Sequence, residues 1–341
     1  MRRRSLLVAL LALVVIAGAA LSIYWVWAAE RLGLAIAEWT EEQRARGYDI
    51  AYRDPEIGGF PAKLSVRIAE PRITAPQGWS WSGGAIAGQA AFWRPRVLEL
   101  ALPRKQKLIA PWGGRLHELA LEAAEARGLI QLGSGGWVQT ATVEMTDLTL
   151  TESTAWTLRA ERFRHDLTRR PPSVESTDDW TLVMSGEVTK LQLPEAAVSP
   201  FGRTIDRLSM NAVLLGFIPA GEPAAALAEW RDSGGLMDFR ELTLTWGDLD
   251  ARATGTATLD ERLRPQGAFT ARIAGLPEAL DTLARQGLIE PAAAMAFKLS
   301  ALALAKNRDE TGRTVVEVPI TLQDGLFYLG PVAIFSLAPV L

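Results

Sequence analysis

The segment of residues 249–275, LDARATGTATLDERLRPQGAFTARIAG, has the two-residue period of a β-hairpin. One set of alternate positions in its first half is small or apolar, namely Leu249, Ala251, Ala253, Gly255, Ala257 and Leu259. The positions between them are polar, namely Asp250, Arg252, Thr254, Thr256 and Thr258. Because successive side chains of a strand point to opposite faces, this pattern predicts a sheet with one apolar and one wet face. Residues 264–267 are expected to form the turn, and Phe269, Ala271 and Ile273 the returning strand.

The same period recurs through most of the chain after residue 60. It is found in residues 63–68, 97–102, 143–150, 156–164, 208–214 and 242–246. Strand patterns repeated at this frequency between turn residues are typical of antiparallel, mainly β proteins. Two segments have helix patterns, residues 223–230 and 277–286, and each opens with a proline and stops before a glycine. We therefore predict a mainly β, α+β body with a few helices packed on an antiparallel sheet.

A glycine pair at the start of GGFPAKLSVRI, residues 58–68, raises the question of a phosphate-binding loop. Such a loop needs glycines at set offsets followed by a helix, and a Walker loop also needs a Lys-Ser or Lys-Thr pair. Neither pattern is present, and Leu64, Val66 and Ile68 alternate with polar residues instead. The glycines are therefore expected to form a turn that leads into a strand.

Two segments have conflicting patterns. Residues 116–132, LHELALEAAEARGLIQL, and residues 291–305, PAAAMAFKLSALALA, alternate like strands but are rich in alanine. Propensity alone favours a helix in both. The charged segment of residues 164–179, with its paired prolines, is expected to be an exposed loop. If the body of residues 47–341 has two lobes, we expect them to divide near residues 165–180.

The N-terminus carries a membrane-anchor pattern. Arg2, Arg3 and Arg4 precede an apolar run over residues 6–29, in which Ser22 is the one clearly polar residue. A helix of that length reaches roughly 36 Å, enough to cross a hydrocarbon core of about 30 Å. The alternative is a cleaved signal peptide, since Ala17-Gly18-Ala19 resembles a cleavage site. We favour the retained anchor because the apolar run continues for ten residues beyond that site.

The anchor is expected to continue outward as a helical stalk over residues 30–46. Leu32, Ala35, Ile36 and Trp39 form an i, i+3, i+4, i+7 stripe, and Gly47 is a suitable C-terminal cap. Arginines before the span place the N-terminus, residues 1–5, in the cytoplasm. The sequence thus predicts a single-pass inner-membrane protein whose body lies in the periplasm, with Tyr24, Trp25 and Trp27 at the outer headgroup level.

Composition excludes several classes of function. The net charge of −3 supplies no long-range field for nucleic acid, so no nucleic-acid partner is expected. With no cysteine and two histidines, the chain has no thiolate chemistry and no histidine-rich metal site. HELAL at residues 117–121 lacks the second histidine of a zinc-protease helix. We predict no cofactor, no metal, no catalytic residues and no enzymatic activity.

Twelve tryptophans are unusual for this length. Trp79 and Trp81 are two residues apart, so on a strand their rings share a face, where they form either a core stripe or a wall for a ligand. Trp93 lies beside Arg94 and Arg96, which either are solvated or suit an anionic headgroup. The predicted ligand-binding residues are therefore Trp79, Trp81 and Trp93 for acyl chains, with Arg94 and Arg96 near a headgroup.

Several phrases resemble one known family. GGFPAKLSV at residues 58–66, WRP followed by VLELALP at residues 93–103, TWGDLDARATGTATLDERLRPQG at residues 245–267 and LQDGLFYLGP at residues 322–331 resemble the bacterial envelope proteins of domain-of-unknown-function family 2125. The C-terminal strand pattern is also similar to that of AsmA-like envelope proteins. The similarity to AsmA-like proteins implies a long, curved antiparallel sheet and a part in lipid or outer-membrane homeostasis. The resemblance to family 2125 implies no catalytic residues, because that family has none assigned.

Two functions follow as hypotheses. The first is a membrane-anchored protein that holds lipid or another apolar ligand on its curved sheet. The alternative is a non-enzymatic scaffold whose sheet edges recruit envelope proteins by β-augmentation. Lipid holding requires an apolar face that stays open, whereas scaffolding predicts an interior filled by the protein's own side chains.

Overall fold

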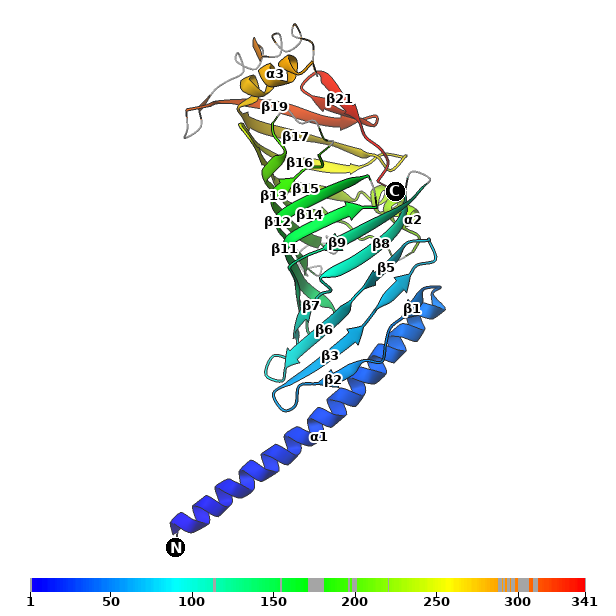
Figure 1. The fold of residues 1–341 in the computed structure, drawn as a ribbon, viewed down its shortest axis with the longest axis vertical. Helices are drawn as coiled ribbons and strands as arrows, with labels where there is room; N and C mark the ends of the chain where they lie inside the picture. Colours follow the sequence, from blue (N-terminus) through cyan, green and yellow to red (C-terminus); the bar gives the residue numbers. More distant parts are fainter. Residues whose placement is uncertain are drawn as a thin grey trace. The chain divides into compact units, whose positions relative to one another are not determined.

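The computed structural model shows a mainly β chain with a curved, open antiparallel sheet, which confirms the predicted fold class (Figure 1). The structure describes residues 2–112, 115–153, 155–170, 181–195, 197, 201–219, 221–287, 290, 292, 295, 298–299, 307–308 and 312–340. These residues form two compact units. Unit 1 comprises residues 1–122 and 126–138, and unit 2 comprises residues 123–125 and 139–341.

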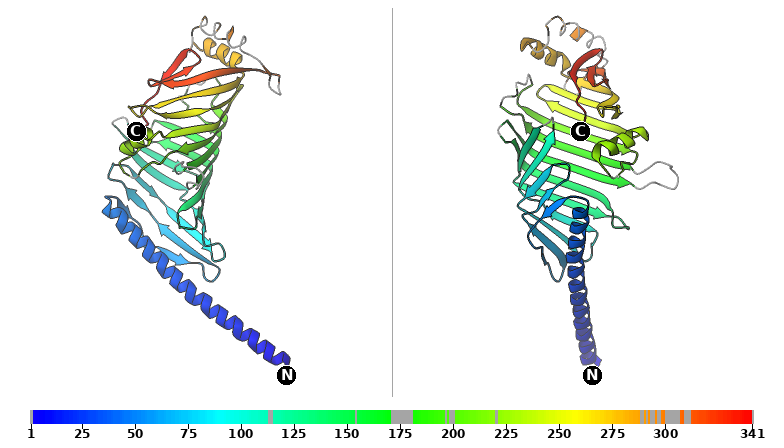
Figure 2. Two further views of the ribbon diagram at one scale, coloured as in Figure 1. Left: turned by 180° about the vertical axis from the view of Figure 1, so that it is seen from behind. Right: turned by 90° about the vertical axis from the view of Figure 1, so that its right-hand side faces the viewer.

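Helix α1, Arg2–Ala45, joins the predicted anchor and stalk in one continuous helix of 44 residues. At 1.5 Å per residue it is about 66 Å long. Its first half stands clear of the strands of unit 1 in the views of Figure 2. The hydroxyl of Ser22, the polar residue of the span, donates to the carbonyl of Gly18 at 2.8 Å. The helix ends as predicted, because Gly47 adopts a φ of 90° and donates its N–H to the carbonyl of Arg44.

The described residues of unit 1 form ten strands in two antiparallel ladders. The first ladder has the order β1–β4–β5–β8–β9. The second has the order β2–β3–β6–β7–β10. The strands are β1 Asp49–Ala51, β2 Glu56–Gly58, β3 Lys63–Ala69, β4 Arg72–Thr74, β5 Ser80–Gly83, β6 Ala85–Ala91, β7 Val97–Ala101, β8 Lys105–Trp112, β9 Arg115–Glu122 and β10 Glu125–Leu132. The chain thus passes repeatedly from one ladder to the other.

The chain passes from one ladder to the other through a short bend. Two consecutive strands on either side of such a bend therefore resemble one long strand that is bent where the two ladders meet; we call this bend the fold line. At the bend between β3 and β4, Glu70 has a φ of 50° and donates its N–H to the carbonyl of Gly84 at 2.6 Å. Gly83 donates in turn to the carbonyl of Pro71 at 3.1 Å. A Cβ at Gly83 would lie 2.7 Å from Pro103, so the close approach at this fold line requires glycine.

Unit 2 is a longer ladder with the order β11–β12–β13–β14–β15–β16–β17–β19–β20–β21, and β18 also pairs with β19. The strands are β11 Val138–Glu152, β12 Trp156–Arg170, β13 Thr181–Gln192, β14 Thr204–Leu215, β15 Leu236–Trp246, β16 Leu249–Leu259, β17 Pro265–Ala274, β18 Asn307–Arg308, β19 Thr314–Gln323, β20 Leu326–Leu329 and β21 Val332–Ser336. All pairs are antiparallel, as the alternating pattern predicts.

One face of the unit 2 ladder is apolar along its length. Registered neighbours form the row Met145, Phe163, Val188, Leu208, Leu244, Ala251, Ile273 and Val316. The adjoining row on the other face is charged or polar, namely Glu144, Arg164, Glu187, Ser209, Thr243, Arg252, Arg272 and Glu317. The prediction of one apolar and one wet face is confirmed.

Helix α3, Leu276–Arg285, covers one end of this apolar face. Leu276 and Leu280 form a buried cluster with Ile273 of β17 and with Val316 and Val318 of β19. Val316 is 0% exposed, whereas Leu208, farther along the same row, is 43% exposed. The apolar face is therefore closed at the C-terminal strands and open nearer the middle of unit 2.

Helix α2, Pro223–Asp232, connects β14 to β15. The carboxylate of Glu222 caps it by accepting from the N–H of Ala225 at 2.8 Å. Trp230 is buried, and its indole N–H donates to the carbonyl of Leu215 at 2.8 Å. A Cβ at Gly235 would overlap the Trp230 ring at 2.3 Å, so this contact requires glycine. Both predicted helices of the body are confirmed within two residues at each end.

One open alternative is resolved and two local predictions were wrong. Residues 116–132, whose patterns conflicted, form β9 and β10, because pairing with β8 and β7 outweighs alanine propensity. The hairpin turn lies at residues 260–264, and Pro265 already begins β17. Residues 164–170 continue β12 instead of forming a loop.

Some predicted features lie outside the described residues. Residues 171–180 are not described, and this applies to most of the second alanine-rich segment, residues 291–305. The predicted lobe boundary near residues 165–180 therefore falls partly within β12 and partly outside the described residues. The two compact units meet in sequence at residues 122–139.

A polar cluster holds the β16–β17 turn. The carboxylate of Asp260 accepts from the backbone N–H groups of Arg262 and Arg264, at 2.8 and 2.9 Å, and from Nε of Arg264 at 2.7 Å. Arg264 also donates to the carbonyl of Asp324, and Arg231 of α2 donates to the carbonyl of Asp260. Burial alone raises the pKa of Asp260, but the hydrogen bonds from Arg264 and Arg262 outweigh it and lower that pKa. The ionised carboxylate therefore fixes the turn and orients Arg264 toward Asp324, while the backbone carbonyl of Asp260 connects the turn to α2.

Replacing Asp260 with asparagine should reduce the free energy of unfolding by about 1.5–3 kcal/mol, because charge-assisted hydrogen bonds are lost. The contribution of the wild-type carboxylate is present above its unfolded pKa of about 3.9 and is lost as the pH falls through the lowered folded value. Urea unfolding of the full chain at neutral and acidic pH measures both effects. Glu261→Gln, on the exposed neighbour, should change stability by no more than about 0.5 kcal/mol; equal effects of the two substitutions would contradict this role.

Candidate functional site

The outer half of α1 packs on unit 1 and is fixed there by polar contacts. Thr40 is 2% exposed. Its hydroxyl donates to the carbonyl of Ile36 at 2.8 Å and lies 3.0 Å from the hydroxyl of Tyr52. Arg44 donates to the carbonyl of Ile50 in β1 at 2.7 Å. These bonds hold the predicted stalk stripe against the first strands of the sheet.

An apolar cavity of about 330 Å³ lies between the stalk and these strands. We call it the stalk cavity. It is lined by Ala35, Ile36, Trp39, Ile50, Ala51, Tyr52, Ile68, Pro71, Arg72, Ile73, Trp81 and Ile86. Among these twelve described residues, Arg72 is the only one with a charged side chain. The cavity is therefore a site for an apolar group with one cation at its boundary.

Strand alternation supplies the sheet side of the cavity. Ile73 of β4 pairs directly with Trp81 of β5, so both side chains are on one face. Ile68 of β3 pairs with Ile86 of β6 in the same way in the second ladder. The fold line at Pro71 brings these two pairs to one cavity.

The polar atom of Trp81 is already satisfied within the protein. Its indole N–H donates to the side-chain oxygen of Gln106 at 3.1 Å, and the Gln106 amide donates to the carbonyl of Pro103 at 3.0 Å. Because the N–H needs no further partner, the ring presents only its apolar surface to the cavity.

The structure separates the five predicted ligand-binding residues. Trp81 lines the stalk cavity, and Trp79 packs edge-on against Tyr48 with ring centroids 6.3 Å apart. Trp93, Arg94 and Arg96 lie in the turn between β6 and β7 and are exposed. Ile86, at the start of β6, lines the cavity, whereas this turn follows the other end of that strand. The predicted set is therefore divided among the cavity, the contact with Tyr48 and the β6–β7 turn, and does not form one site.

Sequence reasoning did not assign most of the cavity-lining residues. The stalk stripe contained Ala35, Ile36 and Trp39, and the strand pattern contained Ile68, but neither pattern states that the two faces meet. The sequence did contain a signal for the cavity, namely an apolar helix stripe followed in the chain by strands with an apolar face. Such a stripe packs on the nearest apolar surface.

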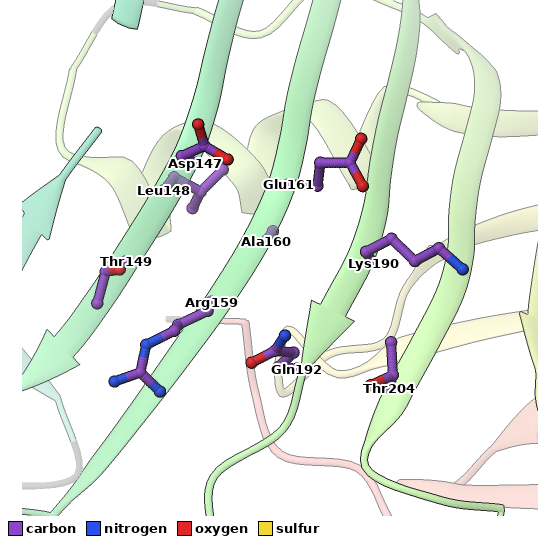
Figure 3. A pocket seen from close by; sticks show the side chains of 9 residues that line it. All are labelled: Asp147, Leu148, Thr149, Arg159, Ala160, Glu161, Lys190, Gln192 and Thr204. Atoms are coloured by element: carbon purple, nitrogen blue, oxygen red, sulfur yellow. The ribbon is translucent and has the colours of Figure 1, made fainter. Parts of the chain in front are cut away.

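Three further hollows in the described part of the chain have charged side chains in their lining. Figure 3 shows one of them in unit 2, of about 430 Å³, where Asp147, Glu161, Lys190 and Arg159 come from neighbouring strands. Asp147 and Lys190 have φ angles of 48° and 52°, and the ladder pairing skips both, so this hollow marks a bend in the strands. Lys190 pairs with Asp206 at 2.6 Å.

The resolved pKa shifts near these hollows come from ion pairs on the wet face. The hydrogen bond with Asp206 raises the pKa of Lys190, and the same bond lowers the pKa of Asp206. The hydrogen bond from Arg164 lowers the pKa of Asp166. Each shift favours the charged form, so these groups are solvated ion pairs rather than acids or bases poised for proton transfer.

The family comparison covers most of the chain. A model described as an uncharacterized protein conserved in bacteria, DUF2125, matches residues 25–338. The chain belongs to the DUF2125 family. Neither the curated proteins nor the solved structures include a match to it.

The match begins at Trp25, so it includes the stalk and all residues that line the stalk cavity of this DUF2125 protein. The predicted family membership is confirmed. The similarity to AsmA-like envelope proteins is not supported by any of these comparisons and stays a prediction.

Proposed function

We propose that this DUF2125 protein is a membrane-anchored envelope protein that binds a lipid or a similar amphipathic molecule. The observation that carries the proposal is the stalk cavity, with its apolar lining and Arg72 at its boundary. Its volume of about 330 Å³ is at the lower end of the range of small-molecule sites, roughly 300–1,000 Å³. The proposed activity is binding, and no catalytic residue is part of it.

The chemistry of the lining selects the ligand class. Each methylene buried in an apolar site contributes about 0.8 kcal/mol, so an acyl segment of several carbons is retained without any hydrogen bond. Arg72 is exposed and adjoins the apolar lining. A guanidinium beside an apolar cavity fits a molecule with an acyl chain and an anionic headgroup.

The apolar face of unit 2 supports the same function independently. In the apolar row Leu208 is exposed and its neighbours Val188 and Leu244 are half-buried, whereas the end under α3 is closed. Exposed contiguous apolar surface is uncommon on proteins that bind nothing there. A scaffold with a filled interior would not need this open face.

We also propose that α1 is a retained anchor in the inner membrane and that the body is periplasmic. In the described part of the chain, α1 is the one helix long and apolar enough to cross a membrane. The apolar side chains of its first half that are described are exposed, for example Leu13, Ile16 and Ile23, as a lipid-facing segment requires. The three arginines at residues 2–4 favour a cytoplasmic N-terminus.

The lipid proposal predicts where a photoreactive phospholipid attaches to the full chain. A diazirine in the acyl chain should crosslink to peptides that carry Ile36, Trp39 and Trp81, in addition to the membrane span. Ala35→Trp should reduce this cavity crosslinking several-fold, because the larger ring fills the cavity without removing a core side chain. Mass spectrometry of the digested protein gives the readout, with crosslinks to the span as the internal reference.

The matched control is Ala37→Trp. Ala37 is exposed on the same helix and does not line the cavity, so this variant should keep wild-type crosslinking. Crosslinks confined to the span in the wild type would contradict lipid binding. Capture of specific envelope proteins in their place, through the sheet edges, would support the scaffold hypothesis.

The anchor proposal predicts that alkaline phosphatase fused after residue 341 is active in cells, since that enzyme folds only outside the cytoplasm. The membrane-extracted chain should also retain its first 19 residues, as measured by intact mass. An inactive fusion would contradict the topology, and a mature chain that begins after Ala19 would identify a cleaved signal peptide.

A further inference from the structure

Two turns of unit 1 pack against the part of α1 where the apolar run ends. Trp25 contacts Phe60 of the β2–β3 turn edge-on, with ring centroids 5.7 Å apart. The indole N–H of Trp25 donates to the carbonyl of Lys63 at 3.0 Å. Tyr24 contacts Phe92, just before the β6–β7 turn, at 5.5 Å. The position of both turns relative to the helix is therefore set by these contacts.

The same turns expose aromatic side chains. Trp93 is 72% exposed and Phe60 is 55% exposed. Neither lines the stalk cavity, which lies farther along α1 at Ala35 to Trp39. We call the exposed group of Phe60, Trp93, Arg94 and Arg96 the aromatic tip.

Helix geometry gives the level of the tip relative to a bilayer. From Leu6 to Trp25 the helix rises about 29 Å, which equals a hydrocarbon core of about 30 Å. When the apolar run crosses the membrane, Tyr24 and Trp25 therefore lie at the outer boundary of the hydrocarbon. Phe60 and Phe92, which contact them, must lie at the same level.

The residues of the tip suit the headgroup layer. Tryptophan and other aromatic rings are enriched at membrane interfaces, and cations there attract anionic lipids by about 1 kcal/mol each. Arg94, Arg96 and Lys63 are exposed around the two turns, with Glu99 as the nearby carboxylate, hydrogen-bonded to Gln89. Lys63 donates to the Gln89 side chain at 2.7 Å.

We propose that the aromatic tip is a second membrane contact, in which Phe60 and Trp93 insert among the outer-leaflet lipids and Arg94 and Arg96 contact anionic headgroups. The inference rests on α1 crossing the membrane and is independent of a ligand in the stalk cavity. The contact restrains the base of unit 1 against the bilayer. It places the stalk cavity, ten to fifteen residues beyond Trp25, roughly 15–20 Å above the hydrocarbon.

The absence of cysteine allows a direct test, because a single introduced thiol is the only labelling site in the chain. Pro95→Cys, labelled with an NBD fluorophore, reports on the β6–β7 turn of the full chain in lipid nanodiscs. Gln77→Cys is the control: it is an exposed turn residue next to Pro76, which approaches Gly47 beyond the far end of α1. Both changes are in exposed turns, and thermal unfolding confirms that each labelled chain is folded.

The label at residue 95 should be quenched several-fold less by aqueous iodide than the label at residue 77. It should also be quenched by a phospholipid with a nitroxide high in its acyl chain, whereas the control should not. Combining Pro95→Cys with Phe60→Ser and Trp93→Ser should restore iodide quenching toward the control value. Equal quenching at residues 95 and 77 would overturn the proposal.

Lipid composition tests the role of the arginines. Phosphatidylglycerol in the nanodiscs should increase shielding of the label over pure phosphatidylcholine, and Arg94→Gln with Arg96→Gln should remove that increase. Shielding that is the same in both lipids would overturn the assignment of the arginines to headgroups. None of these measurements depends on the stalk cavity, so they separate this proposal from lipid binding there.

Discussion

The packing of the outer half of α1 on the first strands of unit 1 is the contact on which the functional features depend. It places an apolar helix stripe opposite the apolar faces of the two ladders. The helix surface does not fill the space above the bent sheet completely, and the space that remains is the stalk cavity. Thr40 and Arg44 fix this contact with hydrogen bonds to neighbouring backbone and to Tyr52. Since α1 is continuous, the same contact also sets which turns of unit 1 meet the end of the apolar run.

A second constraint is the one-sidedness of the sheet. In unit 2, period-two alternation collects apolar side chains on one face, but α3 covers that face only at β17 and β19. The contact of the uncovered apolar side chains with water is unfavourable in free energy. The polar face, by contrast, is stabilised by solvated ion pairs such as Arg207 with Glu187 at 2.8 Å. This open apolar surface is one of the two observations behind the proposed binding of an apolar ligand.

Much of the fold was predictable because it follows from local spacing. Alternation predicted β3, β7, β11, β12 and β14 to β17, and proline and glycine marked both body helices. The errors occurred where local signals conflict with pairing. Residues 116–132 have alanine-rich helix propensity, yet β9 and β10 form because β8 and β7 offer unpaired edges. The site was less predictable, since Trp81 and Trp93 are close in sequence but belong to different ends of unit 1.

The sequence by itself determined the apolar N-terminal helix, its amphipathic continuation and a sheet with one apolar face, because each of these is a matter of periodicity along the chain. Only the tertiary structure decided which apolar faces meet. The bend at Glu70 and Pro71 brings Ile68 and Ile73 to one cavity under the stalk, and contacts with Tyr24 and Trp25 bring Phe60 and Phe92 to one level. These tertiary contacts involve residues that are far apart in the chain, so they cannot be predicted from the local spacing of residues.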